Sequence, residues 1–242
     1  MANIYDEAVE VARRTMVLFF VVDTSRSMDG EKIGTLNSAV EDVLPEIRSL
    51  SGENADAVIK VAALQFSSGA KWLTYAPMDA DEFNWSWLTA DGYTDLGAAC
   101  RELNSKLSRS AFMSDIAGSF APAIFLLSDG EPTDDYERPL AELWTNNWFK
   151  KAIKVAVAIG DDANTDVLAK FTGNPESVLT AHNPEALRKM IRFVSVTASQ
   201  IGSRSSAVGK LGTDEVASKQ EEFVAQVKAA NVADDDDGDL VW

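Results

Sequence analysis

Residues 16–27 read MVLFFVVDTSRS, and this stretch decides the fold class. Its first seven residues are continuously apolar and rich in β-branched and aromatic side chains, which is typical of a strand covered on both faces of a sheet. The run is far shorter than the roughly 20 residues that a membrane-spanning helix needs. Asp23 ends it, so we expect a buried strand followed by a polar loop.

The rest of the chain alternates between short apolar runs and stretches with helical spacing of apolar residues. Strands are predicted at residues 58–66, 70–75, 123–128, 153–159 and 177–180. Helices are predicted at residues 31–50, 95–107, 136–148, 165–171, 184–201 and 213–230. The first two of these strands flank Ser67-Ser68-Gly69 as a hairpin. The order predicts an α/β fold: a doubly wound, mostly parallel sheet with one antiparallel edge strand and helices on both faces.

The sequence divides into two parts of different character. Residues 1–203 form the predicted α/β domain, and residues 204–242 form a partly helical, acidic C-terminal tail. The tail ends in a run of aspartates, Asp234 to Asp237, followed by Asp239. A charge run of this kind is usually a solvated extension.

Composition excludes several function classes. Lys and Arg number 22 against 38 Asp and Glu, so the formal net charge is −16 and neither nucleic acid nor a membrane surface is a favoured partner. The single cysteine, Cys100, excludes a disulfide within the chain and a cysteine-based zinc site. The single histidine, His182, excludes a two-histidine metal site. Without an export signal and with one thiol, we expect a cytoplasmic protein.

Five oxygen-bearing side chains are expected to meet at one edge of the sheet. Ligands of doubly wound sheets bind beyond the carboxyl ends of the strands. Asp23, Ser25 and Ser27 follow the first strand with D-x-S-x-S spacing, Thr94 begins a helix, and Asp129 follows another buried strand. Hard oxygen ligands suit Mg²⁺ or Mn²⁺, with Ca²⁺ as an alternative. The two carboxylates balance one dication, so an incoming carboxylate is the natural further ligand.

These five residues resemble, in order and placement, the metal-ion-dependent adhesion site of von Willebrand factor A (VWA) domains. Further matches resemble the bacterial tellurium-resistance-associated (TerY/YegL-type) proteins: DTSRSM at residues 23–28, GYTDLGA at 92–98 and LSDGEPTD at 127–134. The resemblance implies a non-catalytic, cytoplasmic protein-interaction module of a stress-response system, linked with a Ser/Thr kinase and a PP2C-type phosphatase. Its partner would supply an Asp or Glu to the metal. Arg26 departs from this subgroup, which commonly has glycine there.

Two other functions remain open. A phosphatase of the haloacid-dehalogenase type also begins with an aspartate after a buried strand. Its chemistry needs a second acid two residues later, where this chain has Ser25, and a lysine for the phosphate, which we cannot assign. An adaptor subunit of an ATP-driven metal-insertion complex is the second alternative. The chain has no phosphate-binding G-x-x-x-x-G-K-[ST] loop, so it is not the ATPase of such a complex.

Two further features have more than one interpretation. Trp85 and Trp87 precede the Thr94 loop and serve either as interface anchors or as core or lid residues. The acidic run at residues 234–239 is either a solubilising extension or a weak competitor for the metal, with Trp242 as an apolar anchor.

Overall fold

The computed structural model describes residues 13–55, 57–115, 118–160, 162–181, 183–204 and 213–230. The strands are β1 (Arg14–Asp23), β2 (Ala57–Ser67), β3 (Gly69–Trp72), β4 (Met78–Asp79), β5 (Ala123–Ser128), β6 (Ile153–Ile159) and β7 (Val178–Ala181). The helices are α1 (Glu31–Glu53), α2 (Leu96–Lys106), α3 (Glu137–Leu143), α4 (Asn147–Lys151), α5 (Thr165–Thr172), α6 (Pro184–Arg204) and α7 (Thr213–Ala229), with 3₁₀ turns η1 (Arg26–Met28) and η2 (Pro175–Ser177). None of these helices combines the length and the apolar character needed to cross a bilayer.

Strand β1 lies inside the one sheet that the described residues form, in the order β3-β2-β1-β5-β6-β7. It pairs in parallel with β2 and β5, and the parallel arrangement continues through β6 and β7. Strand β3 runs antiparallel to β2, as does the two-residue β4, which the sequence did not predict. The predicted fold class, a mostly parallel sheet with an antiparallel edge strand and helices around it, is confirmed.

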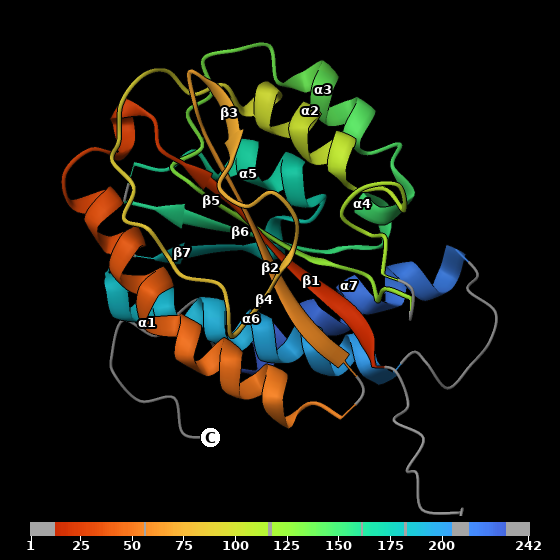
Figure 1. Cartoon of the computed structure of the whole chain (residues 1–242). Helices are drawn as coiled ribbons and strands as arrows, with labels where there is room; N and C mark the ends of the chain where they lie inside the picture. Colours follow the sequence, from red (N-terminus) through yellow and green to blue (C-terminus); the bar gives the residue numbers. More distant parts are fainter. Residues whose placement is uncertain are drawn as a thin grey trace, which may run out of the picture.

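The side chains of β1 alternate between two hydrophobic cores because successive strand residues point to opposite faces. Leu18 and Phe20 belong to the core under α1, α6 and α7. Phe19 and Val21 belong to the core under α2, α3 and α5. Figure 1 shows these two groups of helices on opposite sides of the sheet. Burial on both faces explains why the strand is apolar throughout, and it leaves the carboxyl end as the place for polar groups.

The helix predicted over residues 136–148 is two helices, α3 and α4, separated by a turn. The carbonyl oxygen of the Asn146 side chain accepts hydrogen bonds from the N–H groups of Trp148 and Phe149, which begins α4 anew. Its amide nitrogen donates to the side chain of Asn104 and to the carbonyl of Leu107. A capping residue with partners on another element therefore overrides the continuous helical pattern.

Helix α7 is packed into the body of the protein, although the sequence assigned its residues to the tail. Phe223 is fully buried, and Val224 and Val227 lie beside it in the core under α1 and α6. The side chain of Gln220 accepts a hydrogen bond from the Lys154 N–H and donates one to the Lys154 carbonyl, both at 3.1 Å. The acidic run at residues 234–239 lies outside the described residues, and so does His182.

Candidate metal centre

The carboxyl ends of β1 and β5 bring two aspartates to the same edge of the sheet. Asp23 is the last residue of β1, and Asp129 directly follows β5. The two strands are parallel neighbours with Val22 opposite Leu127, so Asp23 comes to lie beside Ser128. The sheet thus delivers the two predicted carboxylates from residues more than a hundred positions apart in the chain.

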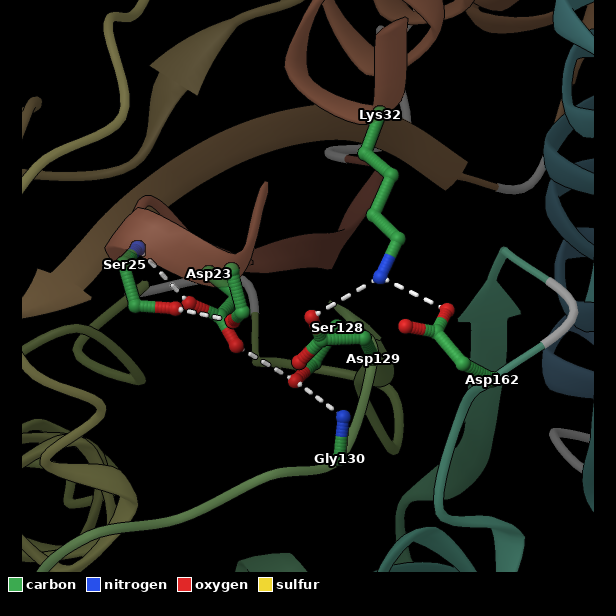
Figure 2. A network of polar contacts seen from close by, with 8 residues as sticks. Asp23, Ser25, Lys32, Ser128, Asp129, Gly130 and Asp162 are labelled. Carbon is green, nitrogen blue, oxygen red and sulfur yellow. Dashed lines mark hydrogen bonds and ion pairs between the residues drawn. The ribbon is translucent and has the colours of Figure 1, made fainter. Parts of the chain in front are cut away.

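Asp23 is fully buried, and both of its carboxylate oxygens accept hydrogen bonds. The Ser25 N–H donates to Oδ1 at 2.9 Å, and the Ser128 hydroxyl donates to Oδ2 at 2.6 Å (Figure 2). Burial raises the pKa of Asp23 from 3.8 to about 6, and these hydrogen bonds oppose that shift. A buried carboxylate with this preference for its neutral form is strongly stabilised by a nearby cation.

The two predicted serine ligands lie together on the loop after β1. Their hydroxyl oxygens are 3.0 Å apart, with Ser25 buried and Ser27 exposed. The turn η1 holds this loop, since the Met28 N–H donates to the Ser25 carbonyl at 3.0 Å and the Met28 side chain is buried in the core. The D-x-S-x-S spacing therefore gathers Asp23, Ser25 and Ser27 at one point.

Asp129 has one oxygen in an ion pair and one without a partner. Its Oδ2 accepts a hydrogen bond from the Lys32 ammonium at 3.2 Å. Its Oδ1 is buried and has no hydrogen-bond partner among the described residues. Leaving a buried acceptor unsatisfied costs about 1–3 kcal/mol, and more when the group is charged. This oxygen has the environment expected of an atom that binds a cation.

Thr94 reaches the same edge through its backbone connections. The loop before it is attached to the β1 loop, because the Asp91 N–H donates to the Thr24 carbonyl at 2.9 Å and the Arg26 N–H to the Gly92 carbonyl at 3.2 Å. Thr94 is buried, and its backbone exchanges hydrogen bonds with Thr133. All five predicted ligand residues therefore lie at the carboxyl edge of β1 and β5, Asp23 as the last residue of β1 and the others in the segments that follow the strands or precede α2.

Gly92 allows the loop before Thr94 to pass close to Ser68, in the turn between β2 and β3. Its φ is +85°, and a Cβ at this position would lie 2.6 Å from the Ser68 hydroxyl. A residue other than glycine would adopt a strained backbone here and would displace the Ser68 hydroxyl. Local backbone freedom is thus part of how the sequence positions Thr94.

Three polar residues of the site were not predicted: Ser128, Lys32 and Asp162. Ser128 is the last residue of β5, and its position immediately before Asp129 could have indicated it. Lys32 lies in the first turn of α1 and pairs with both Asp129 and Asp162, the latter at 2.8 Å (Figure 2). Nothing in the sequence shows that this lysine turns toward β5. Lys32 is thus a cation beside Asp129 that the sequence did not indicate.

The chemistry of the donor set suits a hard dication. Among the described residues, no group of three or more His, Cys, Asp or Glu side chains is placed to hold a metal. The predicted donors at this edge are two carboxylates and three hydroxyls, all of them oxygen. Such sets match Mg²⁺ and Mn²⁺ rather than ions that prefer nitrogen or sulfur.

The surface around this edge carries exposed residues of mixed character. Arg26 lies 3.5 Å from Asp91 with both side chains 83% exposed, a pairing that contributes little to stability. Tyr93 is 70% exposed directly beside Thr94, and Trp87 is 60% exposed along α1. Trp85 is a core residue whose indole N–H donates to Asn37. Trp85 is therefore a core residue, whereas the interface role of Trp87 stays a prediction.

The sequence model of the von Willebrand factor type A domain matches residues 18–193, from β1 into α6. The chain belongs to the von Willebrand factor type A (VWA) domain family. No curated protein sequence matches the chain.

Solved structures share the fold of this VWA domain at low sequence identity. A von Willebrand factor type A protein from Catenulispora acidiphila is 17% identical, with a TM-score of 0.56 over 77% of this chain and 43% of its own. The ArnB paralog VWA2 from Sulfolobus acidocaldarius is 18% identical, with a TM-score of 0.54 over 74% and 45%. Proximal thread matrix protein 1 from the mussel byssus, with a zinc-occupied MIDAS motif, is 14% identical, with a TM-score of 0.58 over 77% and 48%. The chain spans less than half the length of each of these structures.

Proposed function

We propose that this VWA domain is a non-catalytic, metal-dependent protein-interaction module. Asp23, Ser25, Ser27, Thr94 and Asp129 would hold one divalent cation as a metal-ion-dependent adhesion site (MIDAS). The bound cation would supply an electrophilic open face that accepts a carboxylate oxygen. The partner is accordingly a protein that presents an Asp or Glu side chain.

The observation that carries this proposal is the unpartnered Oδ1 of Asp129 at the edge where Asp23 is buried. Two buried carboxylates repel each other, and Asp129 contributes to the raised pKa of Asp23. A dication placed between them would remove this repulsion and satisfy the free oxygen. The hydroxyls of Ser25, Ser27 and Thr94 are neutral, so the charges of the site balance without them.

Mg²⁺ is the cation that we propose, with Mn²⁺ or Ca²⁺ as alternatives. Oxygen donors alone favour hard cations, and Mg²⁺ takes few protein carboxylates. The zinc-occupied MIDAS of the mussel byssus protein supports the view that this edge of the fold accepts dications. The choice of Mg²⁺ over Zn²⁺ rests on the donors of this chain, which contain neither nitrogen nor sulfur.

The cellular setting is proposed from the motifs alone. DTSRSM at residues 23–28 and LSDGEPTD at 127–134 support a bacterial, cytoplasmic role in tellurium resistance or a related stress response, with a Ser/Thr kinase and a PP2C-type phosphatase as partners. The alternative of an adaptor in a metal-insertion complex uses the same site. The phosphatase alternative gains a lysine from Lys32, yet position 25 still lacks the acid that protonates a leaving group.

Calorimetric titration with MgCl₂ and MnCl₂, followed by capture of partners from native lysate with Mg²⁺ or with chelator, tests the proposal. We expect one bound cation per chain and a partner that is lost on chelation. Asp23→Ala and Thr94→Ala should abolish both the binding of the cation and the capture of the partner, while the circular dichroism spectrum is unchanged. Asp91→Asn removes an exposed carboxylate beside the site and should alter neither. A folded wild-type protein that binds no dication would refute the proposal, and turnover of a phosphate ester would favour the phosphatase.

A further inference from the structure

Lys32 forms a bridge between the candidate metal centre and the loop after β6. Its ammonium nitrogen lies 3.2 Å from Asp129 Oδ2 and 2.8 Å from Asp162 Oδ1, and its side chain is 19% exposed. Figure 2 shows the side chain extending from α1 to these two carboxylates, with Asp23 and Ser25 on the other side of Asp129. Three elements of the fold therefore meet at one ammonium group.

The backbone at the end of β6 leaves room for this lysine. Gly160 has a φ of +93°, and a Cβ there would lie 2.5 Å from Lys32 Cε and 2.8 Å from Asp162 Oδ1. Any other residue at position 160 would adopt a strained backbone and would displace the ends of these two side chains. The space that the Lys32 side chain fills is thus provided by the backbone at the end of β6.

The bridge determines which oxygens the aspartates can offer. Lys32 occupies Oδ2 of Asp129 and leaves Oδ1 as the free, buried oxygen. Asp23 has hydrogen bonds on both oxygens. In this arrangement Asp129 offers Oδ1 without a competitor, whereas a cation that also bound Oδ2 would have to share that oxygen with the positively charged Lys32 ammonium.

We infer that Lys32 is a specificity-determining residue of the proposed metal centre, which holds Asp129 as a one-oxygen ligand and so favours a small octahedral cation over Ca²⁺. This inference rests on the proposed function, since it assumes that a dication binds at Asp23 and Asp129. Ca²⁺ takes roughly six to eight oxygens, often with a carboxylate bound through both of its oxygens, whereas Mg²⁺ requires near-octahedral geometry with about six. The Lys32 ammonium at the second oxygen of Asp129 therefore weakens the binding of Ca²⁺ more than that of Mg²⁺.

The positive charge of Lys32 has a separate effect that does not discriminate between dications. It repels any dication at the centre, and this repulsion is similar for Mg²⁺ and Ca²⁺ because their charges are equal. Removing the charge tightens the binding of both ions. The ratio of the two dissociation constants therefore isolates the specificity effect from the charge effect.

The test is a calorimetric titration of the full chain with MgCl₂, MnCl₂ and CaCl₂. Wild-type protein should bind Mg²⁺ and Mn²⁺ more tightly than Ca²⁺. Lys32→Met removes the ammonium and keeps an unbranched side chain. It should reduce the preference for Mg²⁺, measured as the Kd for Ca²⁺ divided by the Kd for Mg²⁺, by about tenfold, which is the lower end of the effect of residues that support metal ligands. Lys32→Arg keeps a charged donor and should retain the wild-type ratio. Arg26→Met removes an exposed charge near the site without touching Asp129 and should leave the ratio unchanged.

The outcomes distinguish this inference from the proposed function. If Lys32→Met binds dications with the wild-type ratio, the inference is wrong and the metal centre stands. If Arg26→Met narrows the ratio as much as Lys32→Met, the change does not depend on the contact with Asp129, and the inference is again wrong. If the folded wild-type protein binds none of the three ions, the proposed function fails and the inference fails with it.

Discussion

The hydroxyl of Ser128 donates a hydrogen bond of 2.6 Å to Oδ2 of Asp23 and joins the end of β5 to the end of β1. The same hydroxyl accepts the N–H of Gly130 at 2.9 Å, so it also orders the loop that carries Asp129. One side chain thereby positions both carboxylates of the proposed metal centre. Support of this kind is what orients metal ligands in proteins.

Ser128→Ala should weaken Mg²⁺ binding by about 10- to 100-fold, because Asp23 and the Gly130 N–H both lose a partner. Calorimetric titration measures the change. Ser105→Ala removes an exposed serine of α2 and should leave the affinity unchanged. An unaltered affinity in Ser128→Ala would mean that Asp23 is held in place without this hydroxyl.

Mg²⁺ should raise the melting temperature of the wild-type protein by about 5–10 °C at a hundred times its Kd, since the ion binds the folded state. In Asp23→Asn the ion should have no effect. Without metal, Asp23→Asn should be at least as stable as wild type at pH 7, because burial disfavours the charged carboxylate there. Differential scanning calorimetry with Mg²⁺ or EDTA measures both effects, and an Mg²⁺-sensitive Asp23→Asn would show that the ion binds elsewhere.

Lys154 should make stability depend on pH in the alkaline range. It is 2% exposed, and burial lowers its pKa from 10.5 to about 8, while its ammonium donates to the carbonyls of Phe149 and Ala152. Between these two values the unfolded chain binds more protons than the folded one, so this contribution to stability rises with pH. The rise is about 1.4 kcal/mol per pH unit.

Urea denaturation of wild type and Lys154→Met at pH 7, 8.5 and 10 measures this contribution as the difference between the two proteins. Other titrating groups cancel in that difference. Lys150→Met, at an exposed lysine of α4, should give a difference that does not vary with pH. The same flat profile for Lys154→Met would show that the Lys154 ammonium is better solvated than its burial indicates.

Gln220→Ala should lower the free energy of unfolding by about 1–3 kcal/mol, because the N–H and the carbonyl of Lys154 both lose their partner on α7. Chemical denaturation measures the change. Glu221→Ala, at the next and exposed position, should be close to neutral. Equal stabilities of the two variants would mean that water replaces Gln220 without loss.

Tyr93→Ala should weaken binding of the metal-dependent partner by about tenfold, because exposed tyrosines beside a binding centre are frequent interface anchors. The metal affinity should not change. Tyr75 is also exposed but lies on the loop between β3 and β4, so Tyr75→Ala is the matched control. Partner binding in Mg²⁺, measured with both variants, decides whether the interface extends over Tyr93.

Continuous apolar runs made the sheet predictable. The strands expected at residues 123–128 and 153–159 have the bounds of β5 and β6, because strands buried on both faces contain apolar residues and little else. The break between α3 and α4 was not predictable, since Asn146 finds its partners on α2 and after it. Strand β4 is two residues long and carries no pattern.

The predicted ligand residues follow from strand ends and from the D-x-S-x-S spacing, which are local features. Lys32 could not be found in this way. Its contacts depend on where α1 begins relative to β5, and on the room that Gly160 leaves at the end of β6. Local sequence therefore indicates which oxygen-bearing residues lie at the edge. The packing of α1 against the sheet decides that the Lys32 ammonium pairs with the negative charge of Asp129.

The docking of α7 also protects an open border of the sheet. Strand β7 pairs with β6 from Ala156 onward, so no strand of the described part of the chain pairs with the first residues of β6 on that side, and Gln220 occupies the main-chain groups of Lys154 there. Unpaired strand edges next to exposed apolar surface are templates for aggregation. A shortened protein that ends at Arg204 would uncover this edge together with the pocket of Phe223. Soluble expression of the domain should therefore require the chain to continue at least through residue 230.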